Sequence, residues 1–252
     1  MSALPHRVGH GQSLVPRFAD PVPAPRRGPD GRRTGGRLAP PWVEQIVSAA
    51  HGMDPMWFSR YLPPENGSTE SAVLVLFGPD PDGQDSLLLI ERAHTLRSHA
   101  GQIAFPGGRV DVEDDDIVAA ALREAREEVG LTVSGVDVIG TLPPLYIPVS
   151  NYAVTGVVAW WRAPAPVSVE DPGEVATVIS VPVDYLVEPA HRHTVSHPSG
   201  YRGPGWDLGG DLLLWGFTGG IVDKVLELSG RAQPWDRRRE LPLPERFTRG
   251  RS

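Results

Sequence analysis

Hydrophobic and polar residues follow the period of β-strands in the first half of the chain. Two β-rich runs, residues 72–77 and 86–91, are separated by residues 78–83, Gly-Pro-Asp-Pro-Asp-Gly. Glycine and proline at this density mark a turn between two strands. The pattern therefore predicts a β-hairpin.

Further elements follow from the same reasoning. Apolar residues at helical spacing predict helices over residues 41–50, 117–129 and 218–228, and short β-rich runs predict strands over residues 136–139, 154–161, 175–181 and 212–215. Strands come first, and helices are interspersed among them without a regular βαβ repeat. This order predicts an α/β fold in which a mixed sheet lies between helices.

The predicted helix over residues 117–129 has two faces of different chemistry. Its apolar residues recur at i, i+4, i+7 and i+11 and form a stripe that can pack on a core: Val118, Leu122, Ala125 and Val129. Glu124, Glu127 and Glu128 stand at i, i+3 and i+4, so their carboxylates converge on another face. The plain alternative is an acidic face that contacts only solvent.

The residues that flank this helix favour a functional site. Gly107 and Gly108 let the backbone approach a ligand closely and offer carbonyl oxygens. Residues 114–116 are all aspartate and stand where a helix N-cap belongs, and Gly130 can end the helix. A glycine turn, an acidic helix start and a carboxylate face together indicate a divalent metal ion and a phosphorylated substrate.

Residues 123–131, Arg-Glu-Ala-Arg-Glu-Glu-Val-Gly-Leu, resemble the second half of the Nudix box. They match its pattern, Arg-Glu-apolar-x-Glu-Glu-x-Gly-apolar, at every specified position. Upstream, the family pattern has Gly, five residues, Glu and seven residues before the arginine. Counting back from Arg123 places Asp115 in the Glu position, and Gly108 lies one residue too far away. The loop therefore carries one inserted residue and an aspartate at a loop-bracing position.

Residues 88–108 narrow the resemblance. They are similar to the signature of the coenzyme A diphosphatase branch, Leu-Leu-Thr-x-Arg-(Ser/Ala)-x3-Arg-x3-Gly-x3-Phe-Pro-Gly-Gly, and depart from it only at Ile90. That branch also tolerates the extra residue in the box loop. The resemblance covers roughly residues 45–230 and implies a Nudix-type α/β/α sandwich with a mixed sheet.

The resemblance implies roles on the metal side of the site. The ligands of Mg²⁺ or Mn²⁺ would be Glu124, Glu127 and Glu128, helped by the backbone carbonyl of Gly107 or Gly108. Arg123 would pair with one of the glutamates and fix its direction. The general base would be Glu124, which we favour, or Glu174, which follows a Pro-Gly turn at the start of a predicted strand. A surface strand end is the alternative for Glu174.

On the substrate side, the resemblance implicates two arginines and one histidine. Arg92 and Arg97 match arginines of the signature, and arginine is suited to bidentate phosphate contacts. A structural salt bridge is the alternative for either arginine. His99 stands near the glycine turn, where substrate contact and a structural role are both open.

The implied reaction is metal-dependent hydrolysis of the diphosphate of coenzyme A or its thioesters, giving 3′,5′-ADP and 4′-phosphopantetheine or its acyl form. Another nucleoside diphosphate derivative, such as ADP-ribose or NADH, is the alternative within enzymes. A Nudix module that senses a nucleotide without cleaving it is the alternative of another class. The intact set of three glutamates favours catalysis.

The organisation of the 252-residue chain follows from composition. Residues 1–40 hold many prolines, glycines and arginines with little apolar periodicity, which predicts a flexible arm. Residues 41–230 are expected to form the Nudix hydrolase domain, and residues 231–252 a basic tail that includes Arg237, Arg238 and Arg239.

Charge and composition limit the partners. The formal net charge of −7 argues against a nucleic-acid partner for the whole protein. No apolar run has the length of a membrane span or a secretory signal, so we expect a soluble, cytoplasmic protein without a membrane partner. The expected partner is a small nucleotide of the coenzyme A type. A homodimer is one assembly that the sequence leaves open.

Other chemistries are excluded by missing residues. The chain has no cysteine, which removes disulfides, thiol nucleophiles and zinc-thiolate sites. Lys224 is the only lysine and follows no phosphate loop, and no Gly-x-Ser-x-Gly elbow occurs. An EF-hand is excluded because its sixth position, counted from Asp111, is not glycine. His191, His193 and His197 are expected to be exposed strand and loop residues, with a transition-metal site as the alternative.

Overall fold

The computed structural model describes residues 36–58, 61–64, 67–148, 150–197 and 200–248. Residues 1–35 of the predicted N-terminal arm therefore lie outside the described residues. None of the helices in the described part of the chain has the length and apolar character that crossing a membrane requires.

Two sheets and six α-helices make up the described structure. The first sheet contains β1 (Thr69–Pro79), β2 (Asp85–Arg92), β3 (Ile103–Ala104), β4 (Gly107–Arg109), β5 (Val136–Thr141), β6 (Leu145–Ile147), β7 (Tyr152–Trp161) and β8 (Val175–Pro182). The second sheet contains β9 (Arg192–Ser196), β10 (Arg202–Gly209), β11 (Leu212–Leu214) and β12 (Glu240–Pro242). The helices are α1 (Pro41–Ala50), α2 (Pro55–Phe58), α3 (Ile117–Val129), α4 (Val183–Val187), α5 (Gly216–Leu228) and α6 (Glu245–Thr248), with 3₁₀ turns at Val133–Gly135 and Pro189–His191.

The first sheet is mixed, as predicted. β1 pairs in parallel with β7 and antiparallel with β2, and the register of the hairpin places Phe77 opposite Leu87. β4 pairs antiparallel with β1, and β6 pairs antiparallel with β7. The glycine turn expected at residues 107–108 is thus a short strand of this sheet.

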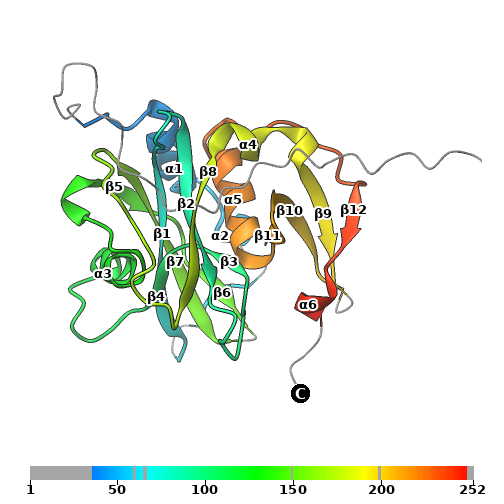
Figure 1. Ribbon diagram of the computed structural model, residues 1–252, viewed down its shortest axis with the longest axis horizontal. Coiled ribbons are helices and arrows are strands. Elements are labelled where there is room, and N and C mark those ends of the chain that lie inside the picture. The colour runs from blue at the N-terminus through cyan, green and yellow to red at the C-terminus, as the bar shows by residue number, and fades with distance from the viewer. Residues whose placement is uncertain (1–35, 59–60, 65–66, 149, 198–199, 249–252) are drawn as a thin grey trace, which may run out of the picture.

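Helices cover both faces of the first sheet, which confirms the α/β/α arrangement. In Figure 1, α3 lies on one side of the sheet, whereas α1 and α5 lie on the other, and α5 stands between the first and the second sheet. β1 supplies both cores, because its alternate side chains point to opposite faces: Leu74 and Leu76 pack on the α3 side, and Val75 and Phe77 on the α5 side. The strand is therefore apolar almost throughout, as expected for a strand buried on both faces.

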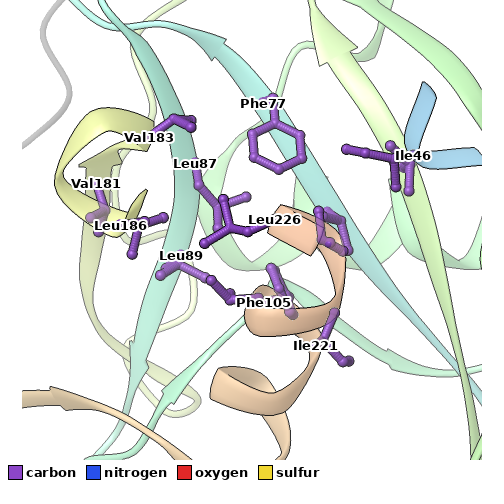
Figure 2. Packing of buried hydrophobic residues seen from close by; sticks show 14 of the residues in the cluster. Ile46, Phe77, Leu87, Leu89, Phe105, Val181, Val183, Leu186, Ile221 and Leu226 are labelled. Atoms are coloured by element: carbon purple, nitrogen blue, oxygen red, sulfur yellow. The ribbon is translucent and has the colours of Figure 1, made fainter. Parts of the chain in front are cut away.

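The core on the α5 side joins the helices to the sheet. Figure 2 shows Leu226 of α5 beside Leu87 of β2, with Phe77 of β1 and Phe105 in the same cluster. Because these residues come from distant parts of the sequence, this core holds α5 in a fixed position against the sheet.

Residues 117–129 form a helix with the predicted boundaries. Asp116 is the N-cap, and its carboxylate accepts a hydrogen bond from the Ala119 N–H at 2.8 Å. Gly130 ends the helix in the left-handed conformation, with φ of 68°. These two residues fix both ends of α3, and thereby the height of its glutamates above the sheet.

The second sheet was predicted only at residues 212–215. Its strand β10, Arg-Gly-Pro-Gly-Trp-Asp-Leu-Gly, contains residues that disfavour strands, and pairing with β9 and β11 compensates for them. β12 pairs in parallel with β9, so residues 240–242 of the expected basic tail are part of this sheet.

One prediction about the histidines is wrong. His193 lies in β9 and is only 2 % exposed, so it is not an exposed strand residue. His191 stacks on the ring of Tyr185. Among the described residues no group of histidines or acidic side chains has the arrangement of a transition-metal site.

Candidate active site

Strand β4 connects the sheet to the acidic face of α3. The N–H of Gly107 donates to Oε2 of Glu128 at 2.9 Å, and the hydroxyl of Ser71 donates to the carbonyl of Gly108 at 2.5 Å. A Cβ at Gly108 would lie 2.4 Å from a carboxylate oxygen of Glu124, so only glycine lets this carboxylate approach the strand. The two glycines therefore bring the backbone against the glutamates.

Arg123 is the centre of the ion pairs at this site. Its Nη1 donates to Glu124 at 3.0 Å and to Glu127 at 3.1 Å, and its Nη2 donates to the carbonyl of Arg109 at 3.1 Å. Because this guanidinium contacts two of the three glutamates, it offsets their mutual repulsion and fixes their direction. The orienting role of Arg123 stays a prediction, and these are the contacts through which it would act.

Asp114, and not Asp115, braces the loop before α3. Nε and Nη2 of Arg123 both donate to the Asp114 carboxylate at 2.9 Å, a bidentate pair, and this contact with Arg123 lowers the pKa of Asp114. Asp115 is exposed. Counting back from Arg123 selected the wrong aspartate, because the inserted residue lies after position 114. Counting forward from Gly108 would have found it, since Asp114 is six residues on.

Glu128 is the most deeply buried acidic residue of the site. It is 2 % exposed, and its Oε1 has no hydrogen-bond partner among the described residues. Burial raises the pKa of Glu128 to about 8, assisted by the charges of Glu124 and Glu174 and opposed by the Gly107 N–H and by Arg92. A buried, unpaired carboxylate oxygen is costly, so this group is suited to receive a cation.

Glu124 and Glu127 differ from Glu128 in exposure. The side chain of Glu124 is 16 % exposed, and burial raises its pKa, whereas the Arg123 guanidinium opposes the rise. The side chain of Glu127 is 53 % exposed. The three carboxylates do not converge on one point, because two of them are directed to Arg123 and the third to Gly107.

The donor set nevertheless fits a hard divalent cation. The side-chain oxygens available at the position belong to carboxylates, and the orphaned Oε1 of Glu128 is the kind of buried oxygen that such an ion would satisfy. Within the described part of the chain no three side chains stand at metal-binding distance from one another. Binding of an ion would therefore require the three carboxylates to move closer together, and Glu124 and Glu127 each keep one oxygen that does not contact Arg123.

Glu174 lies beside the same carboxylates. It is exposed in the turn before β8, and its backbone carbonyl accepts a hydrogen bond from the Ala93 N–H at 2.7 Å. Its negative charge contributes to the raised pKa of both Glu124 and Glu128. The structure thus brings the second candidate base to the site, although from the solvent side.

The three substrate-side candidates occupy two environments. Arg92 ends β2, its Nε is buried without a partner among the described residues, and its charge acts on Glu128. Arg97 and His99 lie exposed in the loop after β2. His99 has a positive φ of 57°, and its Nδ1 lies 3.0 Å from Oε1 of Gln102. The structure brings Arg92 to the carboxylates and leaves the other two on the loop.

Sequence reasoning missed a pocket of about 430 Å³ on the α5 side of the sheet. Residues from α2, β6, β10 and α5 line it. It lies at the same end of the sheet as β4, because one row of paired residues crosses from β4 through β1 and β7 to β6: Arg109, Ser71, Val154 and Leu145. Three strand spacings separate the ends of this row, or about 14 Å. Figure 1 shows β4 and β6 near the same end.

The sequence is similar to those of known Nudix proteins. The model of the NUDIX domain matches residues 68–201. An uncharacterized Nudix hydrolase NudL of Cronobacter sakazakii is 41% identical over 160 residues, which cover 62% of this chain and 80% of that protein. The protein of the same description from Escherichia coli O7:K1 is 39% identical over 158 residues, which again cover 62% of this chain and 80% of that protein. Among solved structures, the Nudix hydrolase RenU of M. smegmatis is similar at a TM-score of 0.47 and 22% identity, covering 68% of this chain and 92% of that one.

The chain belongs to the Nudix hydrolase family, because the domain match spans more than half of it and the NudL identity spans most of that protein. It is an enzyme that acts on phosphoric anhydrides, with a nucleoside diphosphate derivative as substrate. Nudix hydrolases generally use divalent metal cations.

Proposed function

We propose that this enzyme hydrolyses the diphosphate of coenzyme A or its thioesters to 3′,5′-ADP and 4′-phosphopantetheine or its acyl form. The observation that carries the proposal is the path of residues 88–108. This segment, similar to the coenzyme A signature, starts in β2 and ends in β4, and Arg92 and Gly107 both act on Glu128. The signature therefore supplies one wall of the carboxylate site.

A divalent cation, Mg²⁺ or Mn²⁺, would be held by Glu124, Glu127 and Glu128 and would supply charge neutralisation for the diphosphate and a bound water. We favour the carbonyl of Gly107 over that of Gly108 as the backbone ligand. The Leu74 N–H donates to the Pro106 carbonyl, and the Val110 N–H donates to the Glu70 carbonyl. Because every second residue of an antiparallel strand directs its backbone groups at the partner strand, Gly108 points its carbonyl at β1, whereas Gly107 points its carbonyl away. The Gly108 carbonyl also accepts from Ser71, which leaves it little capacity for another partner.

Two residues then serve the reaction at defined places. Arg92 offers a guanidinium whose buried Nε still needs an acceptor, and a phosphate oxygen of the substrate would satisfy it. Glu124 is the favoured general base, because its half-buried carboxylate lies against β4 beside the cation position, whereas Glu174 is exposed. Arg123 orients Glu124 and does not bind substrate.

The test is a substrate panel with purified protein and either Mg²⁺ or Mn²⁺. Coenzyme A, acetyl-coenzyme A, ADP-ribose and NADH are incubated separately, and the products are identified by mass spectrometry. We expect 3′,5′-ADP from the first two, with at least a tenfold preference in kcat/KM over the others. Efficient cleavage of ADP-ribose with coenzyme A left intact would favour the alternative substrate class. Binding without turnover of any compound would favour a sensing module.

A further inference from the structure

The pocket on the α5 side has a composition that suits more than an apolar chain. Aromatic side chains line it from three elements and the loop before β10: Phe58, Tyr146, Tyr201 and Phe217. Arg202 and Lys224 also line it, together with the carboxylate of Asp223. Flat rings with cations near them can receive an aromatic base that carries an anionic group.

The negative charge of Asp223 is already paired. Its carboxylate forms an ion pair with Arg192, whose side chain is 1 % exposed. The guanidinium of Arg192 lies 4.9 Å from the ring centroid of Trp206 and 4.7 Å from that of Trp235. A buried guanidinium needs its carboxylate, so Asp223 is committed to Arg192 and adds no net negative charge to the pocket.

The positive charges of Lys224 and Arg202 differ in whether a carboxylate neutralises them. The ammonium of Lys224 lies 3.5 Å from the ring centroid of Trp57, and within the described ranges no carboxylate stands at ion-pair distance from it. Arg202 pairs with Glu240 at 2.5 Å, but the two side chains are 60 % and 39 % exposed, so water weakens this pair. The pocket therefore carries a net positive charge centred on Lys224.

We propose that this pocket binds the adenosine 3′-phosphate end of the substrate, with Lys224 as the residue that selects the phosphate monoester. The inference rests on the proposed function. Coenzyme A has two ends, and only the nucleotide end combines a flat base with a further phosphate, which matches the aromatic and cationic lining. The pantetheine end has neither group.

The position of the pocket allows one molecule to reach both sites. The row of paired residues that joins β4 to β6 spans about 14 Å. A nucleotide seated against β6 and α5 can therefore direct its diphosphate around the end of the sheet to the carboxylates. A Cβ at Gly220 would meet nothing within 4 Å, so a side chain at this position would enter open space in the pocket.

The first measurement compares kcat/KM for coenzyme A and for 3′-dephospho-coenzyme A. The wild type should prefer coenzyme A by about tenfold or more, and Lys224→Ala should lose most of this preference, because one charge-assisted contact to phosphate is removed. Lys224→Arg should keep a preference. Arg231→Ala is the matched control: Arg231 also lies over a ring, that of Trp42, but pairs with Asp184 outside the pocket, so the preference should stay. A wild-type ratio near one, or an unchanged ratio in Lys224→Ala, would overturn the inference.

The second measurement is binding to the metal-free protein by calorimetry. We expect 3′,5′-ADP to bind about tenfold more tightly than 5′-AMP, Lys224→Ala to equalise the two, and Gly220→Met to block both while the protein stays folded. In kinetics, 3′,5′-ADP should compete with coenzyme A, and non-competitive inhibition would contradict a substrate subsite. If coenzyme A is not cleaved at all, the proposed function fails, and the binding data then decide the inference alone: equal binding of the two nucleotides would refute it.

Discussion

The buried carboxyl of Glu128 should make the metal-free protein less stable as pH rises. The pKa of Glu128 is raised from 4.5 to about 8 in the folded state, chiefly by burial. A group with a raised folded pKa contributes stability that is fully present below its unfolded pKa and is lost as pH rises through the folded value. The stability of the metal-free protein should therefore fall between pH 4.5 and about 8.

The magnitude follows from the proton balance. Between these two pKa values the folded state holds one more proton than the unfolded state, so the free energy of unfolding falls by up to about 1.4 kcal/mol per pH unit. From pH 5.5 to 7.5 the loss from this residue should approach about 2.7 kcal/mol. In Glu128→Gln the amide cannot ionise, so this contribution is absent.

The assay is urea unfolding at a series of pH values in EDTA, for the wild type and for Glu128→Gln. Other carboxylates titrate in both proteins, so the difference between the two free energies isolates Glu128. From pH 5.5 to 7.5, the free energy of unfolding of Glu128→Gln should rise by about 2 to 3 kcal/mol relative to that of the wild type. Parallel pH profiles would refute the assignment of a neutral, buried Glu128.

Divalent metal should reverse the order of stability. If Glu128 is a ligand, Mg²⁺ or Mn²⁺ should raise the Tm of the wild type, release a proton at neutral pH, and leave Glu128→Gln nearly unaffected. Calorimetry in two buffers of different ionisation enthalpy measures the released proton. Equal stabilisation of both proteins by the metal would place the ion elsewhere.

Three further predictions test other parts of the structure. Asp114→Asn should lower metal affinity and kcat by about tenfold or more, because Arg123 loses its bidentate partner, whereas Asp115→Asn should change both less than twofold. Metal titrations and steady-state kinetics measure the two quantities, and equal effects of the two substitutions would contradict the bracing role of Asp114. Deleting residues 239–252 should lower the Tm, because β12 and the buried Leu243 are removed; an unchanged Tm would show that this strand adds no stability. Burial lowers the pKa of His193, so its stabilising contribution is present above pH 6.5 and is lost as pH falls through the folded value. On acidification, the urea midpoint of His193→Gln should therefore drop less than that of the wild type, and an equal drop would argue against a buried neutral imidazole.

The sequence predicted α3 to the residue because each of its features is local. The apolar stripe, the Asp116 cap and the Gly130 terminus all lie within one short segment. The hairpin of β1 and β2 was predicted for the same reason, since its turn follows from local glycines and prolines. Most of the second sheet could not be predicted, because Pro204 and several glycines in β10 hide the strand pattern. The pairing of β12 with β9 also joins segments that are more than 40 residues apart in the chain.

The parts of the candidate site that the sequence predicted are also local, and those it missed depend on contacts between distant segments. Spacing on one helix was sufficient to select Glu124, Glu127 and Glu128, but it could not show that Arg123 holds two of them apart from the third. The contact of Ser71 with Gly108 depends on strand pairing and left no signal in the sequence. The pocket on the α5 side is assembled from four elements far apart in the chain, so no local motif could reveal it.

Product analysis with coenzyme A as the sole substrate tests the central claim most directly. Wild-type protein with Mg²⁺ or Mn²⁺ should give 3′,5′-ADP and 4′-phosphopantetheine in equal amounts, and Glu128→Gln, folded by circular dichroism, should be slower by at least about a hundredfold, the cost of removing one preorganised electrostatic group. Coenzyme A that remains intact with the wild-type protein, or a Glu128→Gln variant with near-normal turnover, would contradict the account.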